Sequence, residues 1–120
     1  MTMLRVKIET LEQSMSSVSE AVKAVEAGEH RSATSVLSFP SWEMLHRVLA
    51  PKRLEIVQAM TGQGPLSIRE VARRVGRDFK GVYGDVDMLL VSGVIDKAEG
   101  GGIVFPYDRI HFEFDIEAAA

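Results

Sequence analysis

The chain has 120 residues, of which 46% are hydrophobic and 26% are charged, enough for one compact core and too little for two. It contains no cysteine, so a disulfide framework and a thiolate zinc site are excluded. No apolar run approaches the roughly 18 residues of a membrane helix, and the opening MTMLRVKIE lacks the apolar core of a signal peptide, so we expect a cytoplasmic protein without a membrane partner.

The net charge of -3 is unevenly distributed. Between residues 66 and 84 five cations accompany two carboxylates, whereas from residue 99 onward one arginine accompanies five carboxylates. A local basic cluster is typical of a phosphate-binding surface, although charges scattered over a solvated surface can also cluster by chance. The distribution therefore leaves nucleic acid open as a partner despite the negative total.

The first predicted unit, residues 1–40, is a strand, a helix and a strand. Residues 4–8 alternate apolar with charged side chains, the period of a half-buried strand. From Thr10 to Gly28 a capping signal precedes apolar residues spaced three and four apart, which predicts a helix. Its narrow seam suits packing on a sheet or, as a short heptad-like stripe, against a second copy. Residues 35–39 predict the second strand.

Two helices in tandem open the second unit, residues 41–107. Ser41 is placed to cap the first helix, and Pro51 suits the first turn of the second, which ends at the turn of residues 62–65. Aromatic residues near this start, Phe39 and Trp42, are expected in the core rather than in a ligand site.

The next segment predicts a helix-turn-helix. Ser67 and Glu70 form a capping box, and Gly76 lies where a left-handed C-cap is expected. Asp78 then caps a third helix that runs to Gly93. Two short helices joined by a glycine turn are the defining pattern of this motif.

Two short strands flank a glycine-rich tip after the third helix. Residues 94–98 and 103–105 predict the strands, and residues 99–102 predict the tip. The final unit, residues 108–120, contains a strand whose outer residues are anionic, whereas those of residues 4–8 are cationic. We expect these two strands to pair, within one chain or across a dimer. The predicted fold is α+β: a winged helix-turn-helix core with a small accessory or dimerisation sheet.

Four stretches carry a resemblance to a known family: LAPKRLEIV, SIREVARRVGRD, VYGDVDMLLVSGVI and PYDRIHFEFDI. From Phe39 onward, over about two-thirds of its length, the chain resembles predicted prokaryotic winged helix-turn-helix regulators that are MarR-like in their DNA-binding core. Some of these are antitoxins encoded beside toxin genes. The family pattern tends to have a basic residue where this chain has Gly84, which implies one DNA contact fewer here.

The resemblance implies a sequence-specific DNA-binding transcriptional regulator, a homodimeric repressor of its own operon that binds a palindromic site on double-stranded DNA. It also implies a role as antitoxin of a toxin-antitoxin pair. The alternative is a protein-interaction module that neutralises a toxin through its N-terminal region, with weak or no DNA binding. A winged helix used only as a scaffold is a third reading.

Residues of the third helix that face away from Val82, Val86 and Leu89 are expected to enter the major groove, with the helix N-terminus leading. Arginines on and just after the preceding helix are expected to hold phosphates, and the glycine tip to lie along the minor groove. The candidate DNA-binding residues are Arg69, Arg73, Arg74, Arg77, Lys80, Gly81, Tyr83, Gly84, Lys97 and Gly101.

Three details of this interface have alternatives. Gly81 and Gly84 cost helix stability, so they serve either close backbone approach to a duplex or relief of crowding against the preceding helix. Arg73 and Arg74 diverge by about 100° on a helix, so one of them is expected to be an ordinary surface charge. Arg77 is expected to be exposed.

Enzymatic chemistry has no support in the sequence. No nucleophile motif, phosphate loop or dinucleotide fingerprint occurs, and we expect no cofactor. The three histidines, His30, His46 and His111, lie far apart without a metal-binding motif, so we expect no metal site either.

Overall fold

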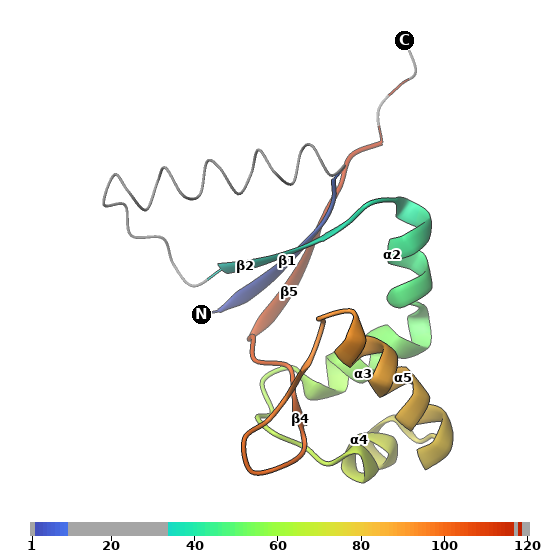
Figure 1. The fold of residues 1–120 in the computed structure, drawn as a ribbon, viewed down its shortest axis with the longest axis vertical. Coiled ribbons are helices and arrows are strands. Elements are labelled where there is room, and N and C mark those ends of the chain that lie inside the picture. Colours follow the sequence, from blue (N-terminus) through green and yellow to red (C-terminus); the bar gives the residue numbers. More distant parts are fainter. Residues whose placement is uncertain (1, 10–33, 117, 119–120) are drawn as a thin grey trace, which may run out of the picture.

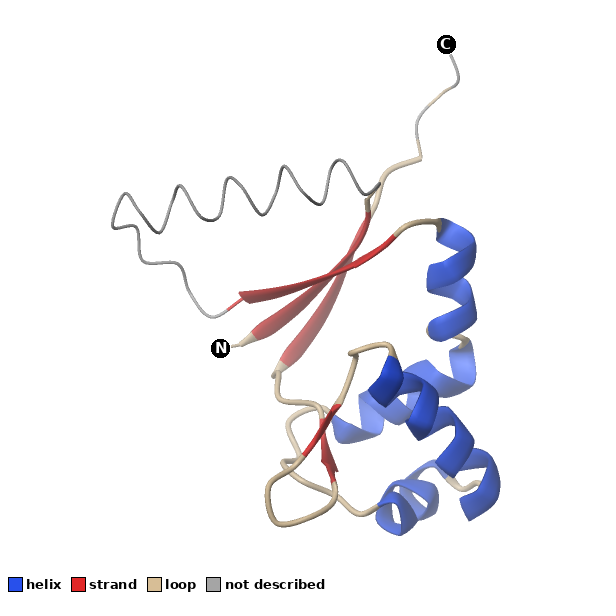
Figure 2. Cartoon of the chain, in the orientation of Figure 1, coloured by secondary structure: helices blue, strands red, loops and turns tan. Residues whose placement is uncertain are grey.

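The computed structural model describes residues 2–9, 34–116 and 118, which form an α+β fold (Figure 1). A parallel sheet lies at one end of the described part, one helix, residues 42–48, lies beside it, and the other helices and an antiparallel hairpin lie at the other end (Figure 2). The predicted α+β class is confirmed. The helix predicted from Thr10 to Gly28 and the residue His30 lie outside the described residues.

The sheet places strands from both ends of the sequence side by side. Its strands are β1 (Met3–Ile8), β2 (Thr34–Phe39) and β5 (Arg109–Glu113), in the order β2-β1-β5. Both pairings are parallel, and Val6 lies beside Leu37 and Phe112, so that the alternating apolar residues share one face. That face packs on the helices.

The predicted pairing of residues 4–8 with the C-terminal strand is confirmed within one chain. On the polar face of the sheet, Arg5 Nε donates to Glu113 Oε2 at 3.1 Å, and the two residues form an ion pair. This contact lowers the pKa of the Glu113 carboxyl. Opposite charges on neighbouring strands thus support the register that the apolar face requires.

The described residues form four helices, and each starts near the predicted position. They are α2 (Trp42–Val48), α3 (Pro51–Met60), α4 (Ile68–Val75) and α5 (Phe79–Val91). Ser41 Oγ accepts from the Met44 amide, and Pro51 occupies the first turn of α3, both as predicted. Local capping chemistry therefore sets the helix boundaries.

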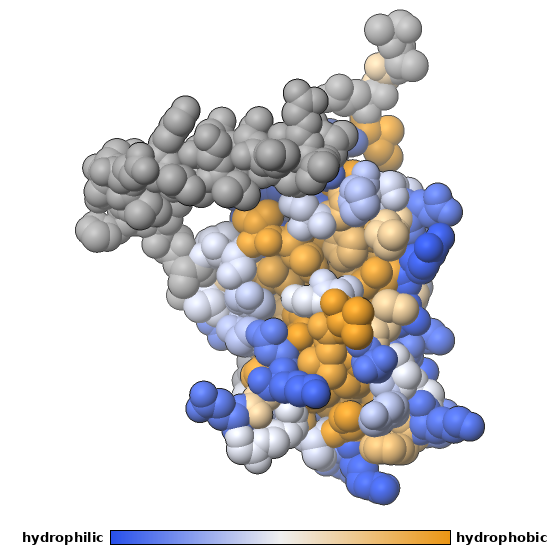
Figure 3. Space-filling view, in the orientation of Figure 1, coloured by the Kyte–Doolittle hydropathy of each residue, from blue (hydrophilic) through white to orange (hydrophobic). Residues whose placement is uncertain are grey.

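One cluster of buried side chains joins the sheet to the helices. Val6 of β1, Ile56 and Met60 of α3, and Leu89 of α5 are all fully buried within it. On the face shown in Figure 3, apolar side chains gather in the middle of the molecule, while hydrophilic side chains lie around the edge of the helical end. Within the described residues, no helix is both long enough and apolar enough to cross a bilayer.

The hairpin is shorter than predicted. Its strands are β3 (Asp96–Lys97) and β4 (Ile103–Val104), paired antiparallel. Val94 and Phe105, predicted as strand ends, lie outside the two strands, and both are buried in the core. A bridge adds Leu66 to the hairpin: its amide donates to the Ile103 carbonyl at 2.9 Å, and the Ile103 amide donates back at 2.8 Å.

The predicted core position of Trp42 is wrong, whereas that of Phe39 is confirmed. Trp42 is 45% exposed, because Leu45 and Val48 occupy the inner side of α2. Its ring meets Phe114 edge-on, with centroids 4.4 Å apart. The aromatic pair therefore lies on the surface beyond the end of β5.

Candidate nucleic-acid interface

The link between α4 and α5 is fixed by its own backbone. Ser67 Oγ accepts from the Glu70 amide at the start of α4, and Gly76 ends that helix with a φ of 68°. Only glycine adopts this left-handed conformation without strain, so the turn needs it. Asp78 then accepts from the Gly81 amide at 2.9 Å and starts α5. The predicted caps at Ser67, Gly76 and Asp78 are confirmed, whereas the carboxylate of Glu70 bonds Arg73 and Arg74 and does not close the capping box on the Ser67 amide.

The outer face of α5 has the predicted composition. Val82, Val86 and Leu89 are buried against the core. The opposite side presents Lys80 and Tyr83 to solvent, and the Tyr83 side chain is 55% exposed. Gly84 and Asp87 are exposed on the same side. No other element in the described part of the chain covers these residues.

The two glycines of α5 have different surroundings. A Cβ at Gly81 would lie 3.2 Å from Asp78 Oδ1 and 3.3 Å from Arg77 Nη2, so this glycine leaves room for the helix cap. A Cβ at Gly84 would meet nothing within 4 Å. Crowding against α4 therefore does not explain Gly84, and within the described residues nothing requires a glycine there.

Of the arginines on α4, Arg73 and Arg74 share one carboxylate. Their Nε atoms each lie 2.9 Å from an oxygen of Glu70, and Arg74 also reaches Gln63 at 2.8 Å. These hydrogen bonds, first that of Arg73, lower the pKa of Glu70 to about 2 and raise the pKa of Arg73. Arg73 is the more exposed of the two, with 70% of its side chain accessible against 33% for Arg74. It is the one better able to reach an external anion.

Arg69, on the first turn of α4, has a different environment. Its guanidinium lies 4.8 Å from the centroid of the Phe79 ring, a cation–π contact that joins the starts of α4 and α5. The N–H groups of a guanidinium in contact with a ring remain able to donate hydrogen bonds. Arg69 is therefore held in place without losing its capacity to bind phosphate.

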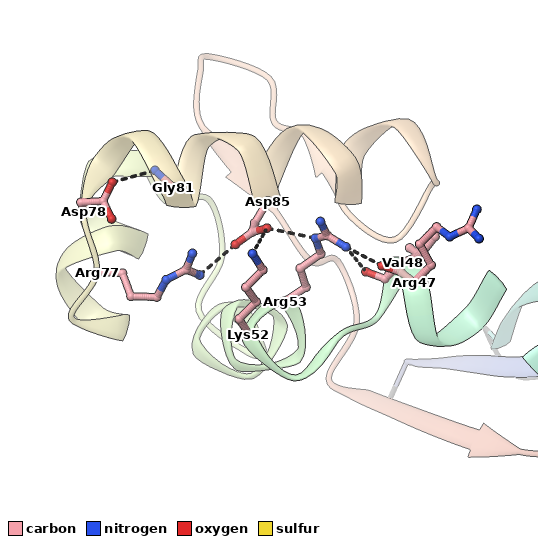
Figure 4. Close-up of polar contacts among 8 residues, drawn as sticks. All are labelled: Arg47, Val48, Lys52, Arg53, Arg77, Asp78, Gly81 and Asp85. Carbon is pink, nitrogen blue, oxygen red and sulfur yellow. Dashed lines mark hydrogen bonds and ion pairs between the residues drawn. The ribbon is translucent and has the colours of Figure 1, made fainter. Parts of the chain in front are cut away.

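Arg77 is not the exposed cation that its position in the turn predicted. Its side chain is 25% exposed, and its Nη1 lies 2.9 Å from Asp85 Oδ2 (Figure 4). Neither atom has a hydrogen bond to any other described residue. The expectation of an exposed Arg77 is wrong because the turn directs its side chain back under α5.

The carboxylate of Asp85 is the centre of a buried charge network. Arg53 Nε from α3 donates to Asp85 Oδ1 at 3.0 Å, and Lys52 Nζ lies 3.8 Å from the same oxygen. Arg53 also donates to the carbonyls of Arg47 and Val48 at the end of α2. A single aspartate thus ties α2, α3 and the α4–α5 turn to α5.

Burial alone would raise the pKa of the Asp85 carboxyl, whose side chain is 4% exposed, but the neighbouring Arg77, Arg53 and Lys52 outweigh burial and lower it. A buried carboxylate is costly unless it is paired, so Asp85 depends on these cations. Asp85 is not among the residues predicted from the sequence. The sequence does contain one clue to this site. Asp85 lies three residues after Val82, on the side of α5 that faces the core, where an acidic residue is unusual.

A groove of about 540 Å³ separates α5 from the hairpin. Its lining is mostly apolar and includes the cations Arg69 and Lys97. Gly101 and Gly102, from the tip between β3 and β4, also line it. Its lining residues are Ser67, Ile68, Arg69, Phe79, Tyr83, Val86, Asp87, Leu90, Lys97, Ala98, Gly101, Gly102 and Ile103.

The close fit of the hairpin to Leu66, just before α4, depends on Gly102. Its φ is 82°, and a Cβ there would lie 2.8 Å from the Leu66 carbonyl oxygen. The glycine-rich tip is therefore required by geometry at this position, whereas Gly101, with a φ of 104°, faces open space.

The structure brings together four of the predicted interface residues: Arg69, Tyr83, Lys97 and Gly101 line one groove. Arg73 and Arg74 are exposed on α4 outside that lining, and Lys80, Gly81 and Gly84 lie along α5. Arg77 is held inside by Asp85.

Residues 48–112 match the model of the family described as HVO_A0114. The chain belongs to the HVO_A0114 family. No curated protein and no solved structure matches it. The segment that matches the HVO_A0114 model contains Asp85, its cations Lys52, Arg53 and Arg77, and every residue that lines the groove.

Proposed function

We propose that the protein is a sequence-specific DNA-binding transcriptional regulator with a winged helix-turn-helix core. In this proposal α4 and α5 are the helix-turn-helix, and the β3–β4 hairpin, with Leu66 as a third short strand, is the wing. The protein acts in the cytoplasm as a homodimeric repressor. Two copies are invoked because one such module contacts too few base pairs for a specific site.

One observation carries the proposal. The outer face of α5 is solvent-exposed, contains a cation and a tyrosine, and has at Gly84 a helix-destabilising glycine for which no contact among the described residues accounts. Glycine in a helix interior costs about 1 kcal/mol relative to alanine. A glycine at this position is useful if a large partner must come close to the backbone of α5, because no side chain then stands between them.

The arrangement of the cations fits a duplex. Helix-turn-helix proteins insert the second helix in the major groove, N-terminus first, while the preceding helix crosses the phosphates. Arg69 and Arg73 lie on that preceding helix, and Lys97 lies on the hairpin across the groove. Phosphates on both sides of a major groove would thus meet cations, which offsets the net charge of -3.

A binding titration tests the proposal. We expect purified protein to bind a duplex that contains the DNA upstream of its own gene, measured by fluorescence anisotropy. Lys80→Ala should weaken binding by roughly tenfold, the value of one lost charge-assisted contact. Arg109→Ala is the matched control, since Arg109 is also an exposed cation but belongs to the sheet. Equal affinity of both variants and the unmodified protein would contradict the α5 assignment.

The second candidate is the protein-interaction antitoxin. The exposed Trp42–Phe114 pair favours it, because large aromatic side chains on a surface are typical of protein interfaces. Co-purification with the product of the neighbouring gene, and loss of that complex in Trp42→Ala, would support this role. Lys80→Ala should leave such a complex intact.

A further inference from the structure

The outer face of α5 lacks the side chains that most often distinguish bases by hydrogen bonds. Arginine commonly reads guanine, and asparagine or glutamine commonly reads adenine, each through two hydrogen bonds. The sequence of α5, FKGVYGDVDMLLV, contains none of these three residue types. Lys80 and Asp87 are the charged residues on its exposed face.

Two aromatic rings dominate that face instead. Phe79 and Tyr83 are 40% and 55% exposed, and their ring centroids lie 5.9 Å apart on successive turns. Arg69 covers one side of the Phe79 ring at 4.8 Å, so this ring is held in place and Tyr83 is the outer member of the pair. Both rings line the groove between α5 and the hairpin. The surface that would meet a base is therefore largely apolar.

The base with an apolar group in the major groove is thymine, whose C5 methyl is recognised by contact with apolar or aromatic side chains. Gly84 lies next to Tyr83 and leaves open space on the same face. A ring beside such a gap can approach a methyl group without a neighbouring side chain intervening. The geometry thus favours contact with a methyl group over a hydrogen-bonded pair.

We infer, on the basis of the proposed DNA-binding function, that α5 recognises thymine in the major groove through its methyl group. Tyr83 makes the main contact, Phe79 extends it, and Gly84 allows the close approach. The DNA ligand is a duplex in which each half-site has thymine at the positions that face the first two turns of α5.

Replacement of thymine by uracil removes only the methyl group and leaves base pairing unchanged. The test begins with a duplex selected by the full-length protein from a random-sequence library. Each thymine is then replaced by deoxyuridine in turn. We expect a loss of about threefold to fivefold in affinity at one or two positions per half-site, the value of one buried methyl group. Replacement of the same T·A pair by a 5-methylcytosine·G pair should retain more affinity than a plain C·G pair.

Two variants test whether the aromatic rings cause the difference in affinity between thymine and uracil duplexes. Tyr83→Ala should abolish the difference between the thymine and uracil duplexes. Lys80→Ala should weaken binding to both duplexes equally and preserve the difference. Because the central comparison changes only the DNA, it does not depend on how well a variant folds.

The outcomes separate this inference from the function on which it rests. Binding with equal affinity for thymine and uracil at every position would overturn the inference and leave the DNA-binding function standing. A Tyr83→Ala variant that still distinguishes the two duplexes would also overturn it. Failure to select any duplex would overturn the proposed function itself.

Discussion

On its inner side α5 places Asp85 between two guanidinium groups, and on its outer side it places Gly84 against open space. These residues are neighbours in the sequence, yet one is held by three cations from other segments and the other has no contact that explains it. The contacts of the inner side explain how α5 is held in its position. Within the described residues no contact explains the glycine on the outer side, which is why we propose the binding surface there.

The largest expected effect is on the inner side. Asp85→Ala should lower the free energy of unfolding by about 3–5 kcal/mol, because it leaves the partly buried guanidinium groups of Arg77 and Arg53 without their carboxylate. Chemical denaturation measures this. Asp87→Ala, on the outer side of the same helix, is the control and should change stability by less than about 0.5 kcal/mol. Similar losses in both variants would contradict the central role of Asp85.

The next effect concerns the hairpin. Gly102→Ala should destabilise the protein by at least about 1–2 kcal/mol, the cost of a left-handed conformation in a residue with a Cβ. The steric conflict with the Leu66 carbonyl adds to this cost. Gly101→Ala carries the conformational cost without the conflict, so its smaller loss, measured by the same denaturation experiment, isolates the contribution of the contact.

A smaller effect of opposite sign is expected on the outer side. Gly84→Ala should stabilise the protein by about 0.5–1 kcal/mol, since alanine favours the helix and its methyl group meets no atom. The same variant should bind the selected duplex more weakly. Thermal unfolding and anisotropy together test this: a variant that is more stable and binds equally well would remove the functional reason for the glycine.

The smallest effect is the acid response of the α4 surface. The folded-state pKa of Glu70 is about 2, below its ordinary value of 4.5, so its ion pairs contribute fully above about pH 4.5 and are lost as the pH falls toward 2. Asp85, whose pKa is also lowered, acts in the same direction. Glu70→Gln should therefore flatten the fall of the melting temperature with pH slightly. An unchanged pH profile would show that the exposed pairs contribute nothing measurable.

The helices were predictable because their signals are local. Ser67, Gly76 and Asp78 act on residues within one turn of themselves, and each cap lies where its residue type predicts. The Asp85 network was not predictable in the same way, because Arg53 lies 32 residues earlier and nothing in the spacing links the two. The prediction that Trp42 is buried was wrong for a related reason. The exposure of a side chain depends on which of its neighbours occupy the core, and these contacts are not local in the sequence.

The sequence predicted which face of α5 forms the candidate interface, but not which of its side chains are already bonded to other residues of the chain. Periodicity alone placed Lys80, Tyr83 and Gly84 on the outer side of α5. It could not show that Arg77 turns inward or that Arg73 and Arg74 share Glu70, because these outcomes depend on the backbone path of the turn. The groove between α5 and the hairpin could not be predicted from the sequence at all.

The position of β1 between β2 and β5 has a consequence for folding kinetics. Thr2 and Asp108, joined by a hydrogen bond just before the paired residues, are 106 positions apart. Closing so long a loop is entropically costly and slows folding, whereas α3, α4 and α5 contact one another over short separations. We therefore expect the helical part to gain structure before the sheet, with amide protection in β1 appearing late in a refolding time course.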